Sequence, residues 1–97
     1  MENFFTIIES EQDESVYKAY YLKLFNLITD AIECEKTAKA VALFKDLEIH
    51  TEPDDTVYKK MYDILVNALE FAKTKQEKEI FNEILINAQQ QTEDLYY

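Results

Sequence analysis

Glycine is absent from the 97 residues of this chain, and proline occurs once, at position 53. Left-handed turns and phosphate-binding loops depend on glycine, so the sequence excludes Gly-rich nucleotide-binding loops, dinucleotide-binding fingerprints and tight two-residue hairpins. A β-sandwich or an α/β fold without a single glycine would be very unusual. The absence therefore favours an all-α fold.

Residues for catalysis and metal binding are also scarce. The one cysteine, Cys34, cannot form an internal disulfide, which fits a reducing compartment. The one histidine, His50, is expected at a helix end in solvent, and no other residue could serve as the base of a nucleophilic triad. Zinc sites need more Cys or His, a calcium loop needs a glycine, and bundle di-metal sites need Glu-x-x-His pairs from two helices. We expect no enzymatic activity, no metal and no cofactor.

The charge of the chain is strongly one-sided. It has no arginine, ten lysines and twenty acidic residues, which gives a net charge of −10 and a pI near 4.4. This balance argues against electrostatic binding of nucleic acid or an anionic membrane. There is no long apolar run and no basic leader pattern at the N-terminus, so we expect a soluble, cytoplasmic protein. With 47% hydrophobic residues, the sequence predicts a single domain over 1–97.

Hydrophobic periodicity predicts four helices. From position 16 to 32 the large apolar residues fall on one half of a helical wheel, with Leu22 as the exception on the polar half. The apolar face of positions 40–47 points about 140° away from that of the first helix at 100° per residue, so a break is expected near 33–37. Pro53 forces a loop, and Asp54 or Asp55 can cap the next helix. The spacing of Thr74 and Glu77 is that of a capping box. The expected helices are therefore 12–33, 35–50, 55–73 and 76–91.

These helices predict a compact antiparallel four-helix bundle made of two helical hairpins, with a short apolar segment before it at residues 1–10. The two halves resemble each other at an offset of 41 residues, for example Tyr17 with Tyr58 and Tyr21 with Tyr62. These four tyrosines lie on apolar faces and are expected in the core or at its rim. The shared core is expected to contain Leu24, Ile28, Leu43, Phe44, Leu65, Leu69, Ile80 and Ile84.

Half of the acidic residues are expected at one end of this bundle, where helices one and three start and helices two and four end. We call this group the acidic pole: Glu9, Glu11, Asp13, Glu14, Glu48, Glu52, Asp54, Asp55, Glu93 and Asp94. Acids at helix starts are explained by capping and by the helix dipole. Glu48, Glu93 and Asp94 are expected at helix ends, where the dipole prefers cations. A functional acidic surface and a merely solubilising one both remain open, and all members except Glu9 are the candidate partner contacts.

In size and acidity the chain resembles the small immunity proteins that neutralise nuclease toxins, and phage-encoded proteins that mimic DNA. The resemblance covers bulk properties and no motif. It implies a non-enzymatic inhibitor of a basic protein partner, such as a nuclease toxin or a DNA-binding protein. The alternative is a regulatory or scaffold bundle that acts through an apolar interface or as a homodimer, with Leu22, Ile49, Phe71 and Ile86 as its patch.

Overall fold

A computed structural model of the chain describes residues 16–96, and all regular structure in this range is helical. The helices are α2 (Val16–Glu33), α3 (Thr37–Ala42), α4 (Val57–Ala72) and α5 (Lys78–Tyr96). The all-α prediction is confirmed for this range. The expected apolar segment at 1–10 lies outside the described residues, as do four acids of the acidic pole, Glu9, Glu11, Asp13 and Glu14.

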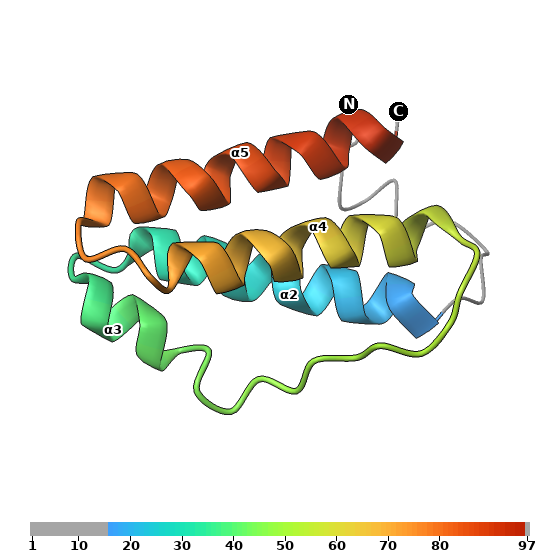
Figure 1. The fold of residues 1–97 in the computed structure, drawn as a ribbon, viewed down its shortest axis with the longest axis horizontal. Coiled ribbons are helices and arrows are strands. Elements are labelled where there is room, and N and C mark those ends of the chain that lie inside the picture. The colour runs from blue at the N-terminus through green and yellow to red at the C-terminus, as the bar shows by residue number, and fades with distance from the viewer. Residues whose placement is uncertain (1–15, 97) are drawn as a thin grey trace.

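Three long helices form the body of the molecule. Helices α2 and α4 run in the same direction and α5 runs in the opposite direction, as the colours of Figure 1 show. Each of these helices packs against the other two, and the short α3 contacts α2. The chain then passes from α3 to the start of α4 through residues 43–56, which we call the return segment. It runs along one side of the molecule without forming a helix.

The second helix is much shorter than the sequence predicts. It was expected over 35–50 but covers only Thr37–Ala42, and residues 43–46 continue as turns. The amides of Leu43, Phe44, Lys45 and Leu47 each donate to the carbonyl of the third preceding residue. Ile49 and Thr51 are β-branched, and the residue before Pro53 is pushed towards extended backbone, so helix propensity is low there. The described residues form four helices, but the exact topology of the expected four-helix bundle is not confirmed, and the repeat at an offset of 41 residues stays a prediction.

The predicted break between the first two helices is confirmed. Helix α2 ends at Glu33, and the amide of Cys34 donates to the carbonyl of Ala31 at 3.2 Å. The ammonium of Lys78 then donates to the carbonyl of Ile32 at 3.0 Å, and a cation is the favourable charge at a helix C-terminus. The break thus follows from the change of apolar phase and is completed by a contact from α5.

The connection between α4 and α5 differs from the expected capping box. The hydroxyl of Thr74 donates to the carbonyl of Phe71 at 2.7 Å, so it satisfies the end of α4 and not the start of the next helix. Helix α5 begins at Lys78 and continues to Tyr96, five residues beyond the expected end at 91. The longer helix keeps Thr92 on its buried face.

The core is built mainly from α2, α4 and α5. The four tyrosines Tyr17, Tyr21, Tyr58 and Tyr62 are buried, as predicted. Of the eight expected core residues, Leu24, Ile28, Phe44, Leu65 and Leu69 are buried and Ile84 is partly buried against the core.

Leu43 and Ile80 were predicted in the core, and both predictions are wrong. Leu43 is 39% exposed because α3 has already ended, and Ile80 is 40% exposed. The buried face of α5 consists of Phe81, Leu85, Ala88 and Thr92, at spacings of four, three and four residues. Ile80 lies about 100° away from Phe81 on the same helix, which turns it towards solvent.

Candidate functional site

Residues 47–52 are held against α2 and α4 by aromatic side chains. The ring of His50 stacks on that of Tyr20, with centroids 3.7 Å apart and planes 5° from parallel. The amide of His50 donates to the hydroxyl of Tyr62 at 3.0 Å, and the hydroxyl of Tyr17 donates to the backbone carbonyl of Glu52 at 2.7 Å. A segment without secondary structure is therefore fixed at both its middle and its end.

His50 was expected as a solvated residue at a helix end, and this prediction is wrong. Its side chain is only 21% exposed, and it belongs to the packing of the return segment. The sequence offered a weak signal for this contact, because Tyr17 and Tyr62 lie on buried helix faces and their hydroxyl groups need hydrogen-bond partners. Nothing in the local sequence pattern indicated which residues would supply those partners.

Glu52 is an acidic residue with a structural role. Its carboxylate accepts a hydrogen bond from Tyr17 at 3.2 Å and lies 3.8 Å from Nδ1 of His50. The hydrogen bond with its own backbone amide lowers the pKa of Glu52 most, burial opposes this, and the contacts with Tyr17 and His50 lower it further. Glu52 therefore stays ionised while it ties the segment to α2.

Asp54 also acts locally. Its carboxylate accepts a hydrogen bond from the amide of Thr56 at 2.7 Å, and it accepts from the hydroxyl of the same residue. This Asx-type turn leads directly into α4, which starts at Val57. The expected role of Asp54 at the start of this helix is supported, although Thr56 occupies the N-cap position itself.

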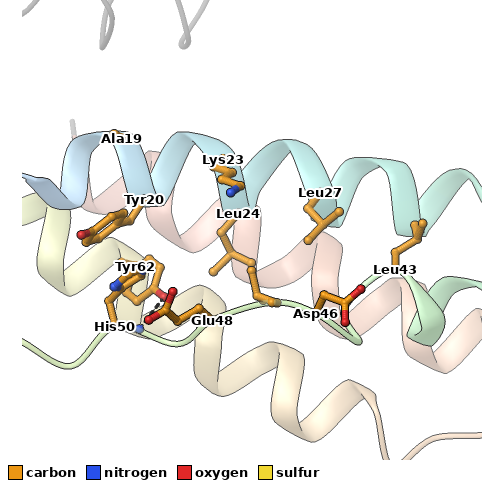
Figure 2. A pocket seen from close by; sticks show the side chains of 11 residues that line it. Ala19, Tyr20, Lys23, Leu24, Leu27, Leu43, Asp46, Glu48, His50 and Tyr62 are labelled. Carbon is orange, nitrogen blue, oxygen red and sulfur yellow. Dashed lines mark hydrogen bonds between the residues drawn. The ribbon is translucent and has the colours of Figure 1, made fainter.

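A groove of about 560 Å³ opens between α2 and the return segment (Figure 2). Tyr20, His50 and Tyr62 form one end of it. Leucines from α2 and from the return segment supply most of its apolar lining: Leu24, Leu27, Leu43 and Leu47. Three charged side chains complete it: Lys23 from α2, and Asp46 and Glu48 from the segment. The groove was not predicted, because a helix over 35–50 would have occupied its place.

The acids of the acidic pole are distributed differently from the prediction. Asp54 and Asp55 precede the start of α4, and Glu93 and Asp94 lie near the end of α5, so these four belong to the end of the molecule where α2 also starts (Figure 1). Glu48 lies farther along the segment and lines the groove. The expectation that Glu48 opposes a helix dipole is wrong, because no helix ends there.

The described residues contain no cluster of three or more His, Cys, Asp or Glu side chains that is placed to hold a metal ion. Within the same range, no helix combines the length and the apolar character that a membrane span requires. Comparison of the chain with protein-family models, with curated proteins and with solved structures finds no match.

The buried tyrosines predict a loss of stability in alkali. Burial and the adjacent Glu52 raise the pKa of Tyr17 to about 12, and burial also raises the pKa of Tyr21 and of Tyr62. Above pH 10 an unfolded chain loses these protons while the folded chain keeps them, so the free energy of unfolding falls as the pH rises from about 10 to 12. Denaturant melts across this range will measure the fall, and Tyr17→Phe should make it less steep. Titration of all seven tyrosines together near pH 10 in the folded protein would contradict the prediction.

Proposed function

We propose that the chain is a small acidic binding protein that neutralises a basic protein partner, a nuclease-like toxin or a DNA-binding protein, by covering the surface that would bind phosphates. The observation that carries the proposal is the fixed acidic stretch 46–55. It contains five acids and no lysine, and the aromatic contacts of His50 and Glu52 hold it in place. A charged surface that is already ordered loses less conformational entropy on binding, and its charge speeds association with a basic partner.

The acids of this surface divide into two groups. Glu52 and Asp54 support the fold through the hydrogen bonds described above. Glu48 and Asp55 are exposed, and Asp94 is exposed with one hydrogen bond, from Gln90 at 3.2 Å. The second group can contact a partner without loss of local structure. Glu93 precedes Asp94 on α5, and Glu11, Asp13 and Glu14 complete the proposed contact set from outside the described residues.

The test compares the wild type with a variant that has lost three exposed charges, Glu48→Gln, Asp55→Asn and Asp94→Asn. These changes preserve side-chain size and lower the net charge from −10 to −7. Each protein is immobilised on beads and incubated with an extract of the host cells. The basic proteins that the beads retain are quantified by mass spectrometry. A specific partner should be released by salt and by double-stranded DNA, which competes for the same basic surface. The affinity of this partner for the variant should fall by a factor of up to about ten, because each lost ion pair contributes a few tenths to one kcal/mol.

A second candidate is the regulatory or scaffold bundle with an apolar interface, and a specific observation favours it. Phe71 is 56% exposed and Ile86 is 50% exposed, and Ile49 is also exposed. Leu22, which was expected in the same patch, is partly buried and packs against the core. A partner that binds the charge-reduced variant as well as the wild type, resists salt and is lost with Ile86→Ser would contradict the acidic proposal and support this one.

A further inference from the structure

The groove between α2 and the return segment has two carboxylates without a cation. Asp46 and Glu48 are exposed, and neither makes a hydrogen bond or an ion pair within residues 16–96. Among the described residues, Lys23 is the one lysine that lines the groove; it comes from α2, whereas the two acids come from the facing segment (Figure 2). The negative charge of the groove is therefore concentrated on one of its sides.

We propose that this groove is the subsite for an arginine side chain of the basic partner, an inference that rests on the proposed function. The guanidinium group would meet Asp46 and Glu48, while its aliphatic stem would lie on the leucines of the lining. Its planar fork of N–H donors suits carboxylates better than an ammonium does. It is also more weakly hydrated than an ammonium, so it loses less when it leaves water for an apolar surface.

The aromatic end of the groove favours the same ligand. Tyr20 and His50 are stacked in parallel and Tyr62 lies 6.1 Å from Tyr20, centroid to centroid, so three rings gather there. A guanidinium group interacts favourably with the faces of aromatic rings, and arginine does so more often than lysine. Lys23 repels a cation from the α2 side and leaves the side of Asp46 and Glu48 as the favourable position for the charge.

The size of the groove adds a requirement for the partner. A volume of about 560 Å³ is within the range of sites that enclose a ligand, and it exceeds what one side chain needs. Leu43, which lines the groove, is 39% exposed. Its side chain therefore offers apolar surface that a second residue of the partner can cover. We therefore expect the arginine to be next to an apolar residue in the partner.

Three peptides of the same length test the inference on the full chain: acetyl-Leu-Arg-Leu-Arg amide, its lysine analogue and its citrulline analogue. Citrulline keeps the shape of arginine without the charge, and lysine keeps the charge without the planar group. In an NMR titration the arginine peptide should shift the amide signals of residues 23–27 and 46–50 and the ring signals of Tyr20 and His50. It should bind about threefold or more tightly than the lysine peptide, and the citrulline peptide should not saturate.

The variant Asp46→Asn with Glu48→Gln should bind the arginine peptide about fivefold more weakly, because two exposed ion pairs are lost. Its matched control is Asp55→Asn with Asp94→Asn, which removes the same charge from the end of the molecule and should change the affinity less than twofold. Equal losses of peptide affinity in the two variants, together with NMR signals shifted at the start of α4 and the end of α5, would overturn the arginine subsite. The proposed acidic function would be unaffected by that result.

Three other results would also overturn the arginine subsite. Binding of the citrulline peptide as tightly as the arginine peptide would show an apolar site. Equal binding of lysine and arginine would show a surface that reads charge alone. Groove signals that move with protein concentration before any peptide is added would show that a second copy of the chain occupies the groove. The capture experiment above tests the acidic function separately, because its variant is scored on the retained partner and not on a peptide.

Discussion

Replacement of Phe81 with alanine is expected to lower the free energy of unfolding by about 3–5 kcal/mol. Phe81 is fully buried on the face of α5 that packs against α2 and α4. Truncation removes its contacts within the core and leaves a cavity that the surrounding helices can fill only in part. A domain of this size has about 5–15 kcal/mol in total, so the variant should be close to unfolding at room temperature. Urea denaturation followed by circular dichroism will measure the loss.

Ile80 provides the matched control for this experiment because it is the preceding residue on the same helix and is 40% exposed. Ile80→Ala should cost less than about 1 kcal/mol, since much of the side chain is already in water. A larger loss for Ile80 than for Phe81 would contradict the observed orientation of α5 and support the orientation that the sequence predicted.

Leu65→Ala should lower the free energy of unfolding by about 2–5 kcal/mol. Leu65 is fully buried in the middle of α4. This helix packs against both α2 and α5. The lost contacts therefore weaken the core cluster that the long helices share. The same urea denaturation, with an unchanged slope against denaturant, will separate a loss of stability from a change in the unfolded state.

The control here is Leu43→Ala. Both leucines were predicted in the core, but only Leu65 is buried, and Leu43 lines the groove instead. Its truncation should cost less than about 1 kcal/mol while reducing the apolar surface of the groove. A loss at Leu65 below about 0.5 kcal/mol would show that α4 faces another way.

The sequence predicted the long helices well because their apolar residues recur at helical spacing. The apolar arc of positions 16–32 gave the first helix and its buried face, including Tyr17, Tyr21 and Leu24. The change of phase gave the break before Thr37, and Pro53 with Asp54 gave the loop before α4. In α5 the same reasoning placed Ile80 in the core, because five apolar residues spread over a wide arc and periodicity alone does not fix the centre of that arc.

The candidate site was predicted only in some of its acidic residues and not in its shape. Glu48, Glu52, Asp54 and Asp55 were identified from charge alone, whereas Asp46 and the groove beside it were not predicted. The groove exists because residues 47–52 are held by side chains from other helices, Tyr17, Tyr20 and Tyr62. Such contacts join positions 12 to 35 residues apart in the sequence, and a local pattern carries no signal for them.

The sequence by itself determined that this chain is helical, that it is acidic, and which faces of α2 and α4 are buried. These properties follow from local composition and periodicity, which each segment carries independently of the rest. Only the tertiary structure decided how the chain returns from Ala42 to Val57. Residues 43–56 have weak helix propensity and some apolar character, so isolated local preferences leave their conformation open. Stacking of His50 on Tyr20, and the hydrogen bonds with Tyr17 and Tyr62, stabilise the extended path and create the groove along α2.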